Sequence, residues 1–140
     1  MASKNREENW NIAFQQTQKV VDGLNKEIDS SILELITALN LSDIRTTSSC
    51  EGHFDINLFP YVSIEKVSEE KAYKVLCEFY ENKKINFSTF IHISDAKGTK
   101  RLINNLNYKT AENDLNKHFN ECQEEFIELG KFLKTQYLNT

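Results

Sequence analysis

An apolar series in the C-terminal segment allows only one kind of local structure. From about Ala111 to Tyr137, apolar side chains recur at alternating steps of four and three residues. This spacing places them along one stripe of an α-helix, and such a stripe is buried against another helix. The sequence therefore predicts a long C-terminal helix whose acidic side chains, Glu125 among them, lie on its solvated outer face. The stripe of the C-terminal helix consists of Leu115, Phe119, Cys122, Phe126, Leu129 and Leu133.

Either of two partners can cover this stripe: another helix of the same chain or a second copy of the chain. One is an N-terminal helix, predicted from about Glu7 to Leu24, whose apolar face has a similar length. Thr17 interrupts that face, and residues 25–28 end it early. Part of the stripe would therefore stay exposed in a monomer, which is unusual for a long apolar surface. The sequence thus predicts a homodimer through the C-terminal helix, and it predicts that Phe126→Glu separates the two copies.

Four segments between the terminal helices have the composition of β-strands. The clearest of them, Ile85 to Ser94, alternates apolar and polar residues, and a turn around Gly98 follows it. Two internal helices are also expected, one after a cap at Asp29 or Ser30 and one after a cap at Ser68. The predicted strands are Ile44–Ser49, Tyr61–Lys66, Ile85–Ser94 and Arg101–Leu106.

The composition supports a single domain. The 140 residues contain four glycines and one proline, which leaves no room for a flexible linker, and they show no internal repeat. One domain spanning residues 1–140 is therefore expected. We predict an α+β fold, in which a small mixed or antiparallel sheet is packed by helices and the N- and C-terminal helices are long.

Charge and hydropathy limit the partners. A net charge of −4 argues against extended nucleic-acid binding, which relies on clustered lysine and arginine. Met1 to Trp10 is polar, and no apolar run approaches the length that spans a membrane. The three cysteines are scattered and odd in number. Together these features predict a cytoplasmic protein with reduced thiols and no membrane partner.

The motif TTSSCEGH, from Thr46 to His53, gathers hydroxyl groups, a thiol, a carboxylate and an imidazole in one loop. Gly52 allows a positive φ, so that successive backbone N–H groups can approach an anionic or polar ligand closely. Glu51 can accept hydrogen bonds from ribose hydroxyls or a base edge, and His53 can donate, accept or carry charge near neutral pH. The motif therefore predicts a loop that binds a small polar ligand.

The segment that contains this motif resembles the opening motif of the wybutosine-synthesis methyltransferase family, the third enzyme of that tRNA-modification pathway. The family shows an aspartate, a helix of the type I..LI..LN, a short spacer and then TTSSCSGR. The strand FSTFIHIS is similar, more loosely, to the family's FILHV-type strand. The matching residues within the run Ile28–His53 are Asp29, Ile32–Asn40, Thr46–Cys50 and Gly52.

The resemblance implies a related fold core and a ligand-binding loop. Members of the family use S-adenosylmethionine to methylate a modified guanine in tRNA. In this chain Glu51 replaces a small polar residue, His53 replaces an arginine, and the family's C-terminal half has no counterpart. The primary hypothesis is therefore a non-catalytic binding or regulatory module for a nucleotide-like or other small polar ligand. The alternative is an S-adenosylmethionine-dependent methyltransferase that acts on a nucleotide or tRNA base.

Residues outside the loop are expected to assist it. His92 lies on the clearest predicted strand, and a basic cluster surrounds the Gly98 turn. That cluster can clamp a phosphate if the strand ends are neighbours, or it can form a solvated hairpin tip. The predicted ligand-binding residues are Thr47, Ser48, Ser49, Cys50, Glu51, Gly52, His53, His92, Lys97, Lys100 and Arg101.

Two other chemistries compete for Cys50. Cys50-x-x-His53 has the spacing of a ligand pair, and His118-x-x-x-Cys122 places two more ligands on one helical face. Together these four residues would form the tetrahedral set that zinc favours. Alternatively, Cys50 could act as a nucleophile, which requires His53, His92 or His118 within hydrogen-bonding reach. The sequence leaves both hypotheses open beside the ligand-binding loop.

Overall fold

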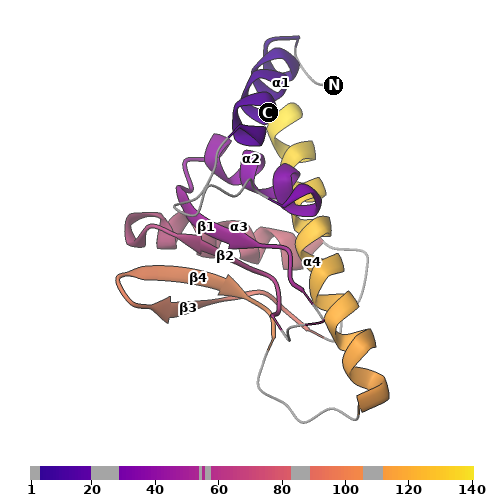
Figure 1. Cartoon of the computed structure of the whole chain (residues 1–140). Helices are drawn as coiled ribbons and strands as arrows, with labels where there is room; N and C mark the ends of the chain where they lie inside the picture. Colours follow the sequence, from indigo (N-terminus) through magenta and orange to yellow (C-terminus); the bar gives the residue numbers. More distant parts are fainter. Residues whose placement is uncertain (1–3, 20–28, 54, 56–57, 83–88, 106–111) are drawn as a thin grey trace.

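The computed structural model describes residues 4–19, 29–53, 55, 58–82, 89–105 and 112–140, and these form helices around one antiparallel sheet (Figure 1). The predicted α+β class is therefore confirmed. Among the helices of these residues, none combines the length and the apolar character that a membrane crossing requires. The helices are α1 (Lys4–Gln18), α2 (Leu33–Leu41), α3 (Glu69–Asn82) and α4 (Glu112–Leu138), with 3₁₀ turns η1 (Ser30–Ile32) and η3 (Lys66–Ser68). The strands are β1 (Thr46–Cys50), β2 (Tyr61–Ile64), β3 (His92–Ala96) and β4 (Thr99–Ile103).

The strands follow the order β1-β2-β4-β3, so β1 and β3 form the two edges of the sheet. β3 and β4 are joined by a two-residue turn at Lys97 and Gly98, where Gly98 has a φ of 84°. The predicted turn around Gly98 is thus confirmed. It lies at one end of the sheet, and the loop that follows β1 lies at the other. The row of paired residues at the loop end consists of Cys50, Tyr61, Ile103 and His92.

The two faces of the sheet have different environments. Val62, Ile64 and Leu102 are buried in the core that the helices form on one face. The alternation of a strand sends the intervening residues to the opposite face. There the Arg101 guanidinium lies over the Tyr61 ring, 4.1 Å from its centroid, and Arg101 Nε donates a hydrogen bond to Ser63 Oγ at 3.2 Å. This second face is therefore polar and aromatic.

The stripe of the C-terminal helix is covered within one chain. Its residues from Phe119 to Leu133 are at most 4% exposed, and Leu115 is half-buried. The main helical neighbour of α4 is α2, while α1 packs beside its C-terminal end, where the Trp10 and Tyr137 rings lie 6.3 Å apart (Figure 1). The predicted partner, the N-terminal helix, therefore covers only part of α4. Because no long apolar strip of this stripe stays exposed, the reason for predicting a homodimer is removed.

Thr17, which interrupts the apolar face of the N-terminal helix, and Gly130, a glycine inside α4, both fit the packing of the helices. Thr17 is only 8% exposed, and its hydroxyl donates to Ala13 O at 2.8 Å, so α1 satisfies it internally. Gly130 lies where α4 crosses the backbone of α2. A methyl group at its Cα would lie 3.0 Å from Leu35 N and 3.1 Å from Leu35 Cα. The glycine therefore allows the close contact that buries the stripe.

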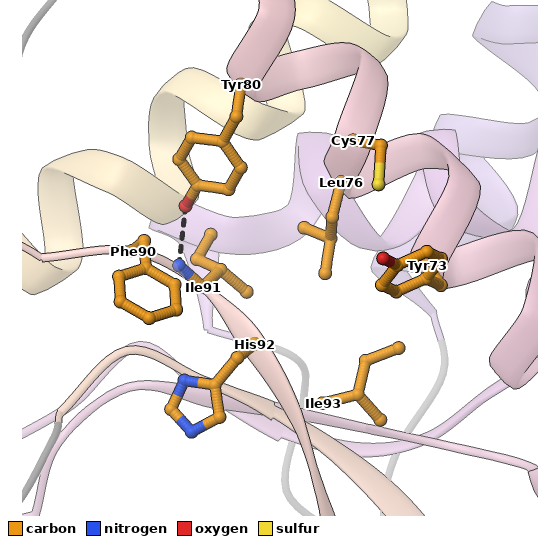
Figure 2. Close-up of a pocket in the computed structure, with 8 residues that line it drawn as sticks. All are labelled: Tyr73, Leu76, Cys77, Tyr80, Phe90, Ile91, His92 and Ile93. Atoms are coloured by element: carbon orange, nitrogen blue, oxygen red, sulfur yellow. Dashed lines mark hydrogen bonds between the residues drawn. The ribbon is translucent and has the colours of Figure 1, made fainter.

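Strand β3 begins later than the predicted strand Ile85–Ser94. The part of that segment up to residue 88 lies outside the described residues, as do residues 20–24 of the predicted N-terminal helix. The residues just before β3 are bonded to helices instead of a strand. Thr89 Oγ1 donates to Glu125 Oε1 at 2.8 Å, and Ile91 N–H donates to Tyr80 Oη (Figure 2). Side chains of α3 and α4 therefore take the place of a neighbouring strand.

The predicted helix caps serve other partners. The N-cap residue of α2 is Ile32, which makes no side-chain cap, and Asp29 Oδ2 accepts a hydrogen bond from Glu51 N–H at 2.9 Å. Ser68 Oγ accepts one from Arg45 N–H at 2.9 Å. Arg45 precedes β1 and Glu51 follows it. Each of the two polar side chains therefore connects the start of a helix with one end of β1.

Candidate metal centre

The backbone N–H groups of the loop after β1 are occupied by hydrogen bonds within the protein. The three N–H groups of residues 51–53 each donate a hydrogen bond inside the protein, so none of them is left to bind an anion. The predicted cradle of backbone N–H groups is therefore not formed. The acceptors, in sequence order, are Asp29 Oδ2 at 2.9 Å, Cys50 Sγ at 3.3 Å and Leu58 O at 2.7 Å.

The Glu51 side chain is also occupied within the chain. Its Oε1 accepts hydrogen bonds from Ser31 Oγ at 2.6 Å and from Ser31 N–H at 3.2 Å. Its backbone oxygen accepts one from Gln123 Nε2 at 2.9 Å. Glu51 thus ties the loop to η1 and to α4. The structure gives this residue a positioning role where the sequence predicts contact with a ligand.

Gly52 adopts the predicted positive φ, with a value of 95°. A methyl group at its Cα would lie 3.0 Å from the Phe119 ring and 3.0 Å from Pro60 Cδ. The close approach that glycine allows here is therefore an approach to α4 and to the start of β2. This packing holds the loop at a defined distance from α4.

Three side chains around the loop converge. A carboxylate oxygen of Asp29, Sγ of Cys50 and a ring nitrogen of His53 all lie within 4.8 Å of one another. Cys50 is 7% exposed, Asp29 is half-buried and His53 is exposed. The thiol thus lies at the base of the group, and the imidazole lies at its opening. Ligand atoms around a tetrahedral zinc ion are about 3.5 Å apart, because the bonds are about 2.0–2.3 Å long. The limit of 4.8 Å exceeds that spacing, so a bound ion would have to draw the three side chains together.

Asp29 is the site residue that sequence reasoning missed. It was predicted only as a helix cap, although the family motif includes an aspartate at this position. Its distance from Cys50 in the sequence gave no reason to expect contact. The contact arises because η1 and the end of β1 are held together by the hydrogen bonds to Glu51.

The environment of Cys50 favours the thiol over the free thiolate. Burial raises the pKa of Cys50, and the negative charges of Asp29 and Glu51 raise it further, although the N–H of Gly52 acts in the opposite direction. A nucleophilic cysteine needs a lowered pKa. The surroundings of Cys50 therefore do not favour the nucleophile hypothesis. A bound metal cation would reverse this balance, because it deprotonates a coordinating thiol.

The other two predicted zinc ligands form a separate pair on α4. Cys122 Sγ lies 3.8 Å from His118 Nε2, and that nitrogen lies 2.9 Å from Asn105 Oδ1. Burial raises the pKa of Cys122 to about 12, and burial lowers the pKa of His118. Within the described residues, neither side chain joins Cys50 and His53 in one group of ligand atoms. The predicted four-residue set is therefore replaced by a three-residue group that contains Asp29.

His92 lies far from the loop. It belongs to the same row as Cys50, but these residues are on opposite edges of the four-stranded sheet. At the usual spacing of neighbouring strands, three steps separate their backbones by about 14 Å. The structure therefore does not bring His92 to the predicted ligand site.

The basic cluster lies at the opposite end of the sheet from the loop. Lys97 is in the β3–β4 turn, and Lys100 Nζ lies 3.0 Å from Glu69 Oε2 and also pairs with Asp95. Arg101 is held over Tyr61 by the contacts described above. The strand ends that would have to be neighbours for a phosphate clamp by Lys97, Lys100 and Arg101 next to the loop are therefore apart. Lys97 and Lys100 lie at the hairpin tip, the other alternative that the sequence leaves open.

The hydroxyl residues of the motif lie along the edge strand β1. Thr47 and Ser48 are exposed, and Ser49 is half-buried. The ladder between β1 and β2 shifts its register between Thr46 and Ser48. These residues stay available to a ligand that approaches the edge of the sheet, although the group formed by Asp29, Cys50 and His53 lies beyond the end of the strand.

No model of a known protein family matches the chain, and no curated protein or solved structure matches it either. The resemblance to the wybutosine-synthesis methyltransferases therefore stays a prediction from the motif, and the site has to be interpreted from its own chemistry.

Proposed function

We propose that the protein is a binding module that holds a zinc-class metal ion through Asp29, Cys50 and His53. The convergence of their three ligand atoms within 4.8 Å carries this proposal. Thiolate, imidazole and carboxylate are the donors that zinc accepts in proteins. Three protein ligands leave a fourth coordination position, which water or a polar group of a ligand can occupy.

The metal ion would supply the positive charge that the loop itself lacks. Because the three loop amides are occupied, an anionic or polar ligand has no free backbone donors to bind among residues 51–53. A cation at the opening beside the exposed His53 would attract such a ligand. We therefore propose that a small polar or nucleotide-like ligand binds at the fourth position and that the module is not catalytic. Coordination through Cys50 requires a reduced thiol, so we propose that the protein acts in the cytoplasm.

Zinc binding can be tested by calorimetry on protein from which metals were removed with a chelator. We expect one Zn²⁺ per chain. His53→Ala removes an exposed ligand and should lower the affinity by more than about 10–100-fold, the loss seen when only an outer-shell partner of a metal site is removed. Cys50→Ser should abolish the thiolate-to-metal absorption of the Co²⁺-loaded protein. Cys77 is a half-buried thiol on α3 outside the group, so Cys77→Ser is the matched control and should retain both signals.

Equal Zn²⁺ affinity in the original protein and in the His53→Ala and Cys50→Ser variants would disprove the site. The same titration with S-adenosylmethionine and a panel of nucleotides separates the functional alternatives. Binding that depends on zinc and on His53 supports the metal-dependent module. Binding of S-adenosylmethionine to the metal-free protein, unaffected by His53→Ala, would support the methyltransferase alternative instead.

The affinity for Zn²⁺ should rise with pH. The metal ion binds the Cys50 thiolate, and burial raises the pKa of this thiol, so a proton must leave at neutral pH when the ion binds. Releasing one proton makes the affinity increase about tenfold per pH unit for as long as the thiol is protonated in the metal-free protein. Titrations between about pH 6 and pH 8, in buffers of different ionisation enthalpy, measure this release. The slope should be shallower in Cys50→Ser, and an unchanged slope would contradict ligation by the thiol.

A further inference from the structure

A concave site lies along the β3 edge of the sheet, away from the Cys50 loop. A pocket of about 390 Å³ opens between α3 and the segment that leads into β3 (Figure 2). Leu76 and Ile91 are buried at its base, 6% and 2% exposed. Tyr73 and Phe90 border it and are 65% and 51% exposed. The volume is sufficient for a large apolar side chain or a small ligand.

The backbone of β3 offers hydrogen-bonding groups beside this pocket. In a two-residue hairpin, the two residues that flank the turn exchange both backbone hydrogen bonds with each other. From there along the ladder, hydrogen-bonded pairs alternate with pairs that are not hydrogen-bonded. The flanking pair here is Ala96 and Thr99. Ser94 therefore directs its N–H and C=O towards β4, whereas Ile93 and Asp95 direct theirs away from the sheet. Within the described residues, no hydrogen bond occupies these outward groups. The edge is ready to accept a further strand.

Tyr80 closes one end of this edge. Ile91 is the next residue along the chain whose N–H and C=O point away from β4. Its N–H donates to Tyr80 Oη, as the dashed line in Figure 2 shows. The Tyr80 hydroxyl in turn donates to Glu125 Oε2 at 2.6 Å. An added strand therefore has a short open edge from Ile93 to Asp95, and the apolar pocket lies next to it.

We propose that this edge and pocket bind an extended peptide segment of a partner protein by β-strand addition. The peptide backbone pairs with the outward groups of Ile93 and Asp95. Residues that face each other on neighbouring strands point to the same side of the sheet. Ile93 lines the pocket, so the peptide residue opposite Ile93 sends its side chain into the same pocket. An aromatic or large aliphatic residue at that position fits the apolar lining.

Charge at the hairpin end of the edge specifies a second peptide residue. Lys100 is paired there with two carboxylates, those of Glu69 and Asp95. Lys66 and Lys97 are exposed at the same end, and they form no ion pair with a described residue. Lys66 begins η3 just after β2, and Ile64 at the end of β2 pairs with Lys100, so Lys66 lies at this end of the sheet. These five groups together carry one net positive charge, and the exposed ammonium group of Lys97 favours an acidic peptide residue beside it. In an antiparallel strand this acidic residue precedes the apolar one.

A second copy of the chain fits this edge poorly. Two copies that pair through their outward groups around Ser94 place Ile93 of one chain opposite Asp95 of the other. The carboxylate of Asp95 and the ammonium group of Lys97 from the second copy would then lie beside the apolar pocket. Burying such charges without partners is costly. The pocket therefore suits a foreign strand with apolar side chains better than it suits the protein's own β3.

The proposal can be tested by fluorescence anisotropy with a fluorescein-labelled peptide in which two glutamates precede an alternation of phenylalanine and threonine. Asp95→Pro removes an outward N–H without touching the ladder to β4, and proline is tolerated on edge strands. Asp95→Ala is the matched control, because it removes the same carboxylate and keeps the N–H. We expect Asp95→Pro to bind the peptide about tenfold more weakly than Asp95→Ala, which corresponds to one lost hydrogen bond.

A second measurement uses the unaltered protein and does not depend on the folding of any variant. Methylation of the peptide at the nitrogens that face β3 should abolish binding, and methylation at the alternate nitrogens should preserve it. His53→Ala should leave peptide binding unchanged, because that residue belongs to the metal centre. Equal binding of the two methylated peptides would overturn strand addition, because the peptide would then be held by its side chains alone. Self-association that the peptide does not reverse would overturn it in favour of a second copy.

Discussion

Replacing Glu125 by alanine is expected to destabilise the protein by about 3–5 kcal/mol, although the sequence pattern places this residue on the solvated face of its helix. Glu125 is 0% exposed. Its carboxylate accepts hydrogen bonds from Tyr80 Oη at 2.6 Å, Thr89 Oγ1 at 2.8 Å and Asn104 Nδ2 at 2.9 Å. These bonds connect α4 with α3 and with the residues that precede β3 and follow β4.

The expected loss has two physical sources. Alanine leaves three buried donors without their acceptor, and an unsatisfied buried polar group costs about 1–3 kcal/mol. It also leaves a cavity beside the core. Burial and the hydrogen bond to Glu125 raise the pKa of Tyr80, so this phenol remains a protonated donor across the range in which the protein is handled. The loss is a large part of the stability of a typical domain, which is about 5–15 kcal/mol.

Urea denaturation followed by circular dichroism measures this effect. Glu124→Ala is the matched control, because it removes the neighbouring exposed glutamate and should change the stability by less than about 0.5 kcal/mol. Tyr80→Phe removes only one of the three donors and should give an intermediate loss. A stability of Glu125→Ala equal to that of Glu124→Ala would show that the network does not stabilise the fold.

Phe126→Glu is expected to unfold the protein rather than to separate two folded copies. Phe126 is 1% exposed and belongs to the core between the helices and the sheet. Loss of a buried phenylalanine costs about 3–5 kcal/mol. The new carboxylate would in addition be buried in an apolar environment without a partner, which costs several kcal/mol more. The sum approaches or exceeds the stability of a typical domain.

Circular dichroism and light scattering distinguish the two outcomes. We expect the variant to lose its helical signal and its cooperative transition. Ile12 is 55% exposed on α1, so Ile12→Glu introduces the same charge at the surface and should remain folded. A Phe126→Glu protein that is folded, with half the mass of the original protein, would instead restore the homodimer predicted from the stripe.

Much of the fold could be predicted from local patterns. The period of the stripe predicted the C-terminal helix, and α4 ends at Leu138, one residue beyond the predicted end. The sequence DAKGTK predicted the turn at Gly98, because a glycine there adopts a positive φ without strain. The alternating pattern located β3 only in part, since the hydrogen bonds to Thr89 and Ile91 come from helices that are distant in the sequence.

The candidate site was predicted less completely. The motif located Cys50 and His53, and the positive φ of Gly52 was anticipated. The hydrogen bonds that occupy the loop N–H groups could not be predicted from the motif. Their acceptors include Asp29, which approaches the loop only when η1 packs against the end of β1. His92 and Lys97 were assigned to the site because their side chains suit a ligand. Strand order and register, which no local pattern records, place them elsewhere.

The sequence by itself determined the elements whose cause is local: the long helix with its apolar stripe, the β3–β4 turn and a loop rich in metal-binding side chains. Only the tertiary structure decided which elements meet. α2 covers the stripe because Gly130 lets the two backbones approach, and Glu125 becomes buried because three donors from other elements converge on it. Asp29 lies near Cys50 because η1 packs against the end of β1. Periodicity and turn chemistry depend on neighbours in the chain, whereas these contacts depend on shape and hydrogen bonding between segments that are far apart in it.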